Sequence, residues 1–272
     1  AGRIECVSIS SRILAHSVRY CALLPPSYDT GKSSHYPVLY YLHGLGENEQ
    51  MFVSSDGWQL IEDLRDQGKI GEFLIVTPDA DRTFYINSRE GRTRYEDFFI
   101  REFLPYIERR YRIQPGRAHR GIAGISMGGY GALRFAFRYP QLFSSVSVHS
   151  PALLEKFPAI AVSNPRHSQV VRMMGTAFGS PPDPAYWDRN TPFALARTSR
   201  PSGLKIYLDC GTEDEYGFNA GAQQFHDLLS ARGIPHEFHL YPGGHDWQYF
   251  ASHLPASLEF ESNAFGLSAK TK

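Results

Sequence analysis

Six short apolar runs, spaced along most of the chain, constrain its fold more than any other feature. Several are nearly continuous, which is typical of strands in a parallel sheet that is covered on both faces. The runs lie at residues 36–42, 73–77, 119–124, 144–148, 204–208 and 236–241. Apolar patterns with helical spacing separate them, at residues 58–67, 95–111, 129–139 and 220–232. Strands alternating with helices predict right-handed crossovers, and therefore an α/β fold with a mostly parallel central sheet.

The N-terminal residues follow a different pattern, with apolar and polar side chains alternating over residues 3–9 and 17–23. A period of two predicts two half-buried strands, and we expect them to form an antiparallel hairpin at an edge of the sheet. Pairing of residues 3–10 with 16–24 would let Cys6 face Cys21, which leaves a disulfide open. We nevertheless expect these two cysteines, like Cys210, to be free buried thiols. Because no CxxC or Cys/His ligand spacing occurs, we expect no zinc site.

Residues 151–203 interrupt the alternation of strands and helices. This segment contains eight prolines, and we interpret it as an excursion that covers one end of the sheet. A three-layer α/β sandwich with such an insertion accounts for all 272 residues, so we expect a single domain over residues 1–272.

Charge and hydropathy exclude several kinds of partner. Lys plus Arg and Asp plus Glu both number 28, giving a formal net charge of zero. This balance excludes the basic surface that nucleic-acid binding requires. No apolar run has the length of a membrane-spanning helix, and no charged-then-apolar leader opens the sequence. We therefore expect a soluble protein without a membrane partner, cytoplasmic or secreted, and of open oligomeric state.

The sequence Gly124-Ile125-Ser126-Met127-Gly128 has the form G-x-S-x-G. Such a motif can be a mere glycine-rich turn, or it can be a nucleophile elbow, in which a tight strand-to-helix turn exposes a strained serine. Residues 118–123 before it have the pattern of a buried strand, and residues 129–135 after it have that of a helix. This context favours Ser126 as a nucleophile.

A serine nucleophile requires a histidine base and an acid that orients it, and in this motif's usual fold the order is Ser, acid, His. Asp214 lies in a loop beyond the strand at residues 204–208, where ligands bind in open α/β sheets. Asp209, at the strand end, is the rival candidate, and Glu213 is a more distant one. We favour Asp214 as the acid.

His245 is the best candidate for the base among the five histidines after Asp214. It lies in a glycine-flanked loop directly after the last apolar run, where its ring can approach the serine. The others fall in expected helices or on or beside the last strand: His226, His236, His239 and His253.

Backbone N–H groups are needed to stabilise the oxyanion of a tetrahedral intermediate. The residue after the nucleophile, Met127, supplies one such group in nucleophile elbows. The second is expected after an early strand, where Leu42-His43-Gly44-Leu45-Gly46 forms an HGxG-like turn. We assign it to Leu45, although two glycines in a turn can also occur without this role.

The combination of HGLG, GISMGG, GTED and GGHDW resembles the putative-esterase family of α/β-hydrolases. This family includes feruloyl and acetyl xylan esterases, S-formylglutathione hydrolase and the antigen 85 mycolyltransferases. The resemblance extends from about Val18 to about Phe250. It implies a three-layer α/β-hydrolase sandwich, a catalytic triad of Ser126, Asp214 and His245, and an oxyanion hole at Leu45 and Met127.

Residues 79–88, followed by Tyr95-Glu96-Asp97, resemble the feruloyl-esterase and short-chain-esterase branch. The resemblance implies carboxylic esters with an aromatic or small acyl group. Phe84, Tyr85 and Trp247 could line an acyl pocket, although aromatic side chains near a sheet end are as often plain packing. The segment 151–203 would then be the variable cover that selects the leaving group.

The expected function is therefore that of a serine carboxylesterase that acts through an acyl-enzyme on Ser126. The expected substrate is a small-molecule or carbohydrate-linked ester, and the mechanism needs no metal or organic cofactor. Three alternatives share the motifs: an acyltransferase of the antigen 85 type, a thioesterase that acts on a glutathione conjugate, and a catalytically silent binding protein.

Overall fold

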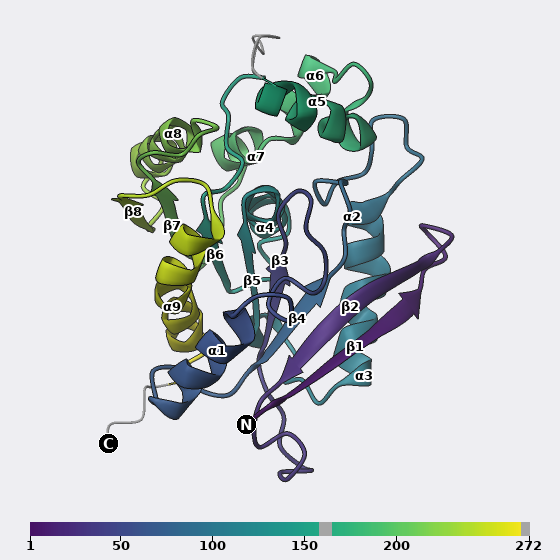
Figure 1. The fold of residues 1–272 in the computed structure, drawn as a ribbon, viewed down its shortest axis with the longest axis vertical. Helices are drawn as coiled ribbons and strands as arrows, with labels where there is room; N and C mark the ends of the chain where they lie inside the picture. The colour runs from purple at the N-terminus through teal and green to yellow at the C-terminus, as the bar shows by residue number, and fades with distance from the viewer. Residues whose placement is uncertain (158–164, 268–272) are drawn as a thin grey trace.

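The computed structural model describes residues 1–157 and 165–267, and in these residues eight strands form one sheet (Figure 1). The strand order is β1-β2-β4-β3-β5-β6-β7-β8. The strands are β1 (Arg3–Ser10), β2 (Ser17–Leu24), β3 (Val38–Leu42), β4 (Leu74–Pro78), β5 (Arg120–Ile125), β6 (Ser145–His149), β7 (Lys205–Gly211) and β8 (Glu237–Tyr241). Strands β3 to β8 are parallel to one another, whereas β2 is antiparallel to both β1 and β4. This arrangement confirms the predicted α/β fold with an N-terminal antiparallel hairpin.

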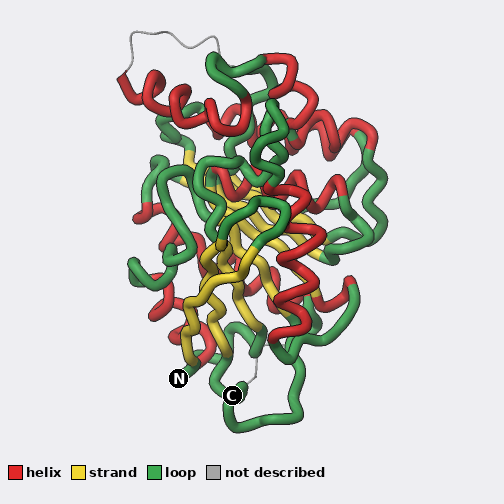
Figure 2. Tube along the Cα trace, turned by 90° about the vertical axis from the view of Figure 1, so that its right-hand side faces the viewer, coloured by secondary structure: helices red, strands yellow, loops and turns green. Residues whose placement is uncertain are grey.

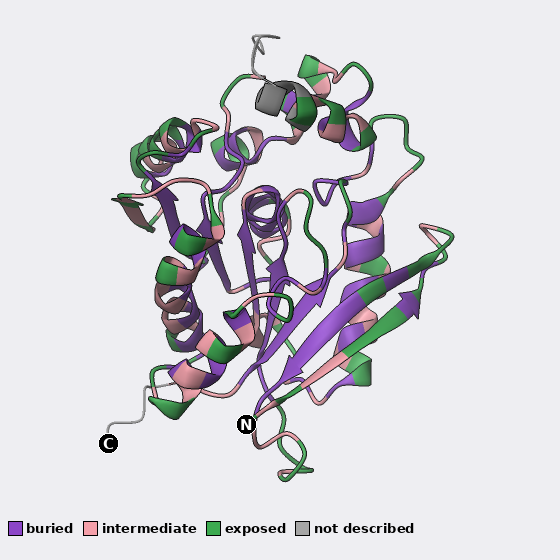
Figure 3. Ribbon diagram, viewed as in Figure 1, coloured by how far each residue is buried: buried purple, intermediate pink, exposed green. Residues whose placement is uncertain are grey.

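The central strands carry apolar side chains on both faces, and helices cover both faces, so these strands are buried (Figure 3). In β3, Leu39 and Tyr41 pack toward one face, and the alternate residues Val38, Tyr40 and Leu42 pack toward the other. The first face is covered by α1 (Gly57–Asp66) and α9 (Trp247–Ala264). The second is covered by α3 (Leu104–Arg110), α4 (Met127–Arg138) and α8 (Phe218–Ala231). Figure 2 shows the sheet between these layers.

The helix predicted over residues 95–111 is present in the structure and contains a π-helical turn. It consists of α2 (Tyr95–Phe98), a π-helical turn over Phe99–Phe103, and α3. Pro105 lies in the first turn of α3 and has no N–H to donate to the preceding turn, so a wider turn replaces the regular α-helix there. The prediction of a helix over residues 95–111 is therefore confirmed, with a π-helical turn within it.

The proline-rich segment forms three helices among its described residues: α5 (Pro165–Phe178), α6 (Pro184–Asn190) and α7 (Pro192–Thr198). Each begins at a proline, whose missing N–H costs nothing in the first turn of a helix. Helix α7 packs against α4 and α8, while α5 and α6 lie above the sheet in Figure 1. Residues 158–164, including Pro158, lie outside the described residues. No helix in the described part of the chain has the length and apolar character needed to cross a bilayer.

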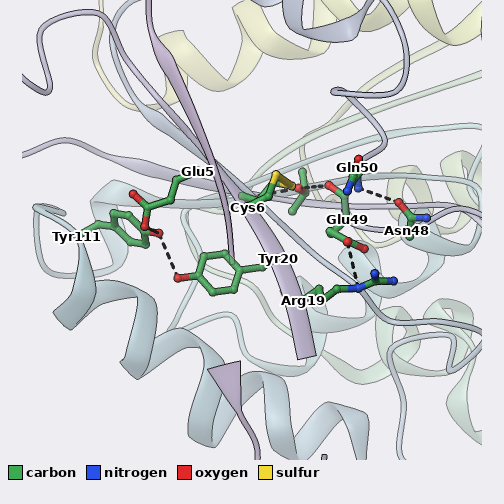
Figure 4. The surroundings of a disulfide bond; sticks show 10 residues. Glu5, Cys6, Arg19, Tyr20, Asn48, Glu49, Gln50 and Tyr111 are labelled. Atoms are coloured by element: carbon green, nitrogen blue, oxygen red, sulfur yellow. Dashed lines mark hydrogen bonds and ion pairs between the residues drawn. A yellow bond between two sulfur atoms is a disulfide. The ribbon is translucent and has the colours of Figure 1, made fainter. Parts of the chain in front are cut away.

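Cys6 and Cys21 form a disulfide, contrary to the prediction of free thiols. The hairpin register places the two residues directly opposite each other on β1 and β2, which brings their thiols together. Glu49, which pairs with Arg19 at 3.2 Å, lies near the disulfide (Figure 4). Cys210 is a free buried thiol, as predicted.

Candidate active site

Ser126 occupies the sharp turn between the end of β5 and the start of α4. Its backbone has φ 57° and ψ −117°, a conformation that non-glycine residues rarely adopt and that costs about 1–3 kcal/mol. The turn is tight because two glycines allow close backbone approach. A Cβ at Gly124 would lie 2.1 Å from the Gly128 carbonyl oxygen, and one at Gly128 would lie 1.9 Å from that of Leu42. The glycines of the motif are therefore required by sterics.

Ser126, His245 and Asp214 form a continuous hydrogen-bonded chain. The distance from His245 Nε2 to Ser126 Oγ is 2.9 Å, and that from His245 Nδ1 to Asp214 Oδ2 is 2.7 Å. Because a carboxylate only accepts hydrogen bonds, Nδ1 carries the proton and Nε2 of the neutral ring accepts from the serine hydroxyl. This tautomer is the one that can remove a proton from Ser126.

Asp214 is held rigidly in the loop that follows β7. Its side chain is buried, and its second oxygen accepts hydrogen bonds from the N–H groups of Tyr216 at 3.0 Å and Phe218 at 3.2 Å. The Cys210 thiol lies 3.8 Å from Asp214 Oδ2, and burial raises the pKa of this thiol. Cys210 is therefore a neutral neighbour of the acid.

The two rival acids lie elsewhere. Asp209 contacts His149 at 2.8 Å, away from His245. Glu213 is exposed and accepts from the Gly243 N–H at 2.6 Å, which ties together the loops that carry Asp214 and His245.

His245 is oriented by aromatic edges as well as by hydrogen bonds. Tyr216, Phe218 and Phe250 surround its ring at centroid distances of 5.0, 5.4 and 5.3 Å, each nearly perpendicular to it. The backbone N–H of His245 donates to Glu215 Oε2 at 2.7 Å. The other four histidines of this part of the chain contact one another or nearby rings: His226, His236, His239 and His253.

Two residues predicted to form the oxyanion hole, Leu45 and Met127, line the cavity that contains Ser126. Met127 is the first residue of α4, so its N–H has no carbonyl partner within the helix. At the second position, the Gly44 carbonyl accepts from His43 Nδ1 at 2.7 Å and from the Glu47 N–H at 3.1 Å. Because the peptide is planar and trans, the Leu45 N–H points away from that carbonyl.

His43 belongs to the HGxG-like turn, but its residue type and position did not predict a role for it. Its ring is fully buried, and its Nε2 accepts from the Ala80 N–H at 2.9 Å, so its Nδ1 carries the proton donated to Gly44. The Tyr85 hydroxyl donates to the His43 carbonyl at 2.9 Å. His43 therefore sets the peptide that presents Leu45, and its position before Gly44 was the only available signal.

A cavity of about 540 Å³ opens over Ser126. Most of its walls are apolar or aromatic, and α5 contributes two residues to it. The lining consists of Gly44, Leu45, Glu47, Phe84, Ser126, Met127, Ala152, Gln169, Met173, Tyr216, Phe218, His245, Asp246, Trp247 and Phe250.

Phe84 and Trp247 line this cavity, but Tyr85 does not. The prediction for Tyr85 was wrong because Phe84 and Tyr85 both have positive φ, 52° and 59°, so the chain turns sharply here. The Tyr85 ring is buried, and its hydroxyl contacts the His43 carbonyl in the HGxG-like turn. Over the described residues, no three His, Cys, Asp or Glu side chains cluster as metal ligands.

Comparison with known proteins shows the family to which this chain belongs. The model of the family described as "Putative esterase" matches residues 11–260. The chain belongs to this esterase family. As a family member it is 34% identical over 243 residues to Esterase Rv1288 of Mycobacterium tuberculosis, a match that covers 82% of the chain and 51% of that relative. The chain thus spans about half the length of this curated relative.

Two other family relatives match over nearly their whole length. The acetyl esterase of Caldicellulosiruptor saccharolyticus is 26% identical over 273 residues, covering 94% of the chain and 97% of the relative. The solved structure of a ferulic acid esterase superimposes with a TM-score of 0.81 and 27% identity, covering 97% of the chain and 99% of that structure.

Proposed function

We propose that this chain is a serine carboxylesterase that acts through an acyl-enzyme on Ser126. The observation that carries the proposal is the chain of hydrogen bonds from Asp214 through His245 to Ser126, which ends in an open cavity. The N–H groups of Leu45 and Met127 complete the set of groups that ester hydrolysis requires.

In the first half of the reaction, Ser126 Oγ attacks the ester carbonyl carbon while His245 Nε2 accepts the hydroxyl proton. The negative oxygen of the tetrahedral intermediate lies against the N–H groups of Leu45 and Met127. The intermediate collapses when the C–O bond breaks and His245 returns its proton to the departing alcohol. In the second half, water attacks the acyl-enzyme with His245 again as base, which releases the acid and restores Ser126.

The substrate is a carboxylic ester with an aromatic or short acyl group, joined to an alcohol such as a sugar. Phe84, Phe218 and Trp247 give the cavity flat apolar surfaces that suit a feruloyl or cinnamoyl group. Family relatives include a ferulic acid esterase and an acetyl esterase, which supports the same acyl range. Helix α5 borders the cavity and is in place to contact the alcohol.

Substitution of the nucleophile tests this function. We expect Ser126→Ala to fold normally, to lose at least ~10³-fold in kcat on 4-nitrophenyl acetate and methyl ferulate, and to lose labelling by a fluorophosphonate probe. Ser252→Ala, which removes an exposed hydroxyl in α9, is the matched control and should keep wild-type turnover. Unchanged hydrolysis by folded Ser126→Ala would refute the proposal.

The same assay separates hydrolysis from acyl transfer. An acyl-enzyme on Ser126 can pass its acyl group to an alcohol in place of water. With a sugar acceptor added, we expect free acid to remain the main product, and a predominantly acylated sugar would reassign the chain as an acyltransferase.

A further inference from the structure

A second Ser–His–Asp arrangement lies among the described residues, beneath the candidate active site. It joins Asp209 on β7, His149 at the end of β6, and Ser257 in α9. His149 Nδ1 lies 2.8 Å from Asp209 Oδ2, and His149 Nε2 lies 2.7 Å from Ser257 Oγ. All three residues are fully buried, so no ester can reach Ser257. This arrangement therefore has a different role from the one that opens into the cavity.

Asp209 lies at the centre of this group of buried polar side chains, called the Asp209 cluster below. Burial alone raises the pKa of its carboxyl, but contacts with His149 and with the hydroxyls of Tyr207 and Tyr249 outweigh burial and hold the pKa below its usual range. The two hydroxyls donate at 2.7 and 2.8 Å. A buried carboxylate with three donors holds all of them in one geometry, since losing any of them leaves an uncompensated charge. Asp209 thus connects β6, β7 and α9.

The cluster is attached to both sides of the candidate active site. On one side, the His149 carbonyl accepts the Ser126 N–H at 3.1 Å. On the other, Tyr249 lies in the first turn of α9, directly after the loop that carries His245. The Tyr249 ring packs closely on this loop, because a Cβ at Gly243 would lie 2.7 Å from it. Movement of the His149 backbone or of the Tyr249 ring would change the 2.9 Å distance between Ser126 Oγ and His245 Nε2.

We propose that Asp209 and His149 are positioning residues that set the distance between the Ser126 turn and the His245 loop. This inference rests on the proposed function, in which His245 takes the proton of Ser126. Transfer of that proton requires hydrogen-bonding distance, and displacements below 1 Å reduce its rate steeply. The cluster acts through Tyr249 on the base and through the His149 backbone on the nucleophile.

Two matched variants separate positioning from mere stabilisation. Tyr249→Phe and Tyr207→Phe each remove one buried hydroxyl that donates to Asp209, and each keeps the ring. Both should fold with similar losses of stability. Only Tyr249 belongs to the helix that follows His245, whereas Tyr207 lies within β7. We therefore expect Tyr249→Phe to lower kcat about tenfold with KM within about twofold, and Tyr207→Phe to change kcat less than about twofold.

The rate of Ser126 labelling by a fluorophosphonate is the second readout. Tyr249→Phe should slow labelling about tenfold and Tyr207→Phe should not, since the rate reports the reactivity of the serine without any ester. Equal rates in the two variants, whether both normal or both reduced, would overturn the inference. Labelling also distinguishes the two proposals: a chain that is labelled at Ser126 but hydrolyses no ester would disprove the esterase function, while the comparison of labelling rates still tests the positioning role.

Discussion

At the residue scale, Phe84 is held in place by the aromatic rings around it. Its ring forms a cavity wall, and edge contacts with Tyr130, Phe178 and Trp187 hold it from behind at centroid distances of 5.5, 5.1 and 6.3 Å. A ring packed in this way cannot rotate to suit a smaller ligand without disturbing its neighbours. It is therefore a fixed flat surface that an aromatic acyl group can contact.

Substitution of this ring should change acyl preference more than it changes catalysis. We expect Phe84→Leu to lower kcat/KM for a 4-nitrophenyl hydroxycinnamate about fivefold, since an aromatic contact contributes about 1 kcal/mol. The value for 4-nitrophenyl acetate should stay within about twofold. Phe265→Leu, a buried aromatic position at the far end of α9, is the matched control. Equal losses on both esters would show that Phe84 does not recognise the acyl group.

At the scale of elements, the hairpin of β1 and β2 is joined to the rest of the sheet only through β4. Its disulfide closes a separation of 15 residues and therefore restricts the unfolded chain. The hairpin lies at the edge formed by β1, whereas the His245 loop follows β8 at the opposite edge. Stability and activity should consequently be separable here.

We expect the double variant Cys6→Ser, Cys21→Ser to lose up to ~3 kcal/mol of unfolding free energy, the value for closing a loop of this length. Its kcat and KM at 25 °C should match those of the wild type. Urea unfolding followed by circular dichroism measures the unfolding free energy, and an ester assay measures kcat and KM. An unchanged urea midpoint would contradict this prediction.

At the scale of the whole molecule, the interface between the sheet and α9 contains a buried acid in addition to the Asp209 cluster. Glu261 of α9 is fully buried and accepts hydrogen bonds from Ser145 and Ser147 of β6 at 2.5 and 2.7 Å. Burial raises the pKa of Glu261 from 4.5 to about 7, against the lowering effect of the two serines. Between pH 4.5 and about 7, Glu261 therefore keeps a proton in the folded protein that it releases in the unfolded chain.

This difference makes stability depend on pH. Because the folded state holds the proton more tightly, unfolding free energy should fall as pH rises from about 4.5 to about 7 and change no further from this group above that range. The expected loss is roughly 3 kcal/mol, from 1.36 kcal/mol per pKa unit. Glu261→Gln keeps the shape and the hydrogen bonds without the charge, so its stability should fall less. Urea unfolding of both proteins at pH 5, 6, 7 and 8 measures the difference, and parallel profiles would rule out this role.

Much of the fold was predictable because its strands and helices carry their own apolar patterns. The apolar runs indicated the parallel strands, and the alternation over residues 3–9 and 17–23 indicated the hairpin. Patterns did not indicate local departures from regular geometry, such as the π-helical turn before Pro105, whose missing N–H interrupts the α-helical hydrogen bonds. They indicated the hairpin that brings Cys6 opposite Cys21, but not that the two thiols are bonded.

The candidate site divides in the same way. By its own local chemistry the sequence determined the tight turn at Ser126, since only glycines fit beside it, and the loops after strands that carry Asp214 and His245. Only the tertiary structure decided that these loops meet at one end of the sheet, that Tyr85 turns inward, and that His149 pairs with Asp209 beneath the nucleophile. The physical reason is that the local backbone conformation depends on residues nearby in the sequence. The distances between residues 126, 214 and 245 depend instead on how strands and helices that are far apart in the sequence pack together.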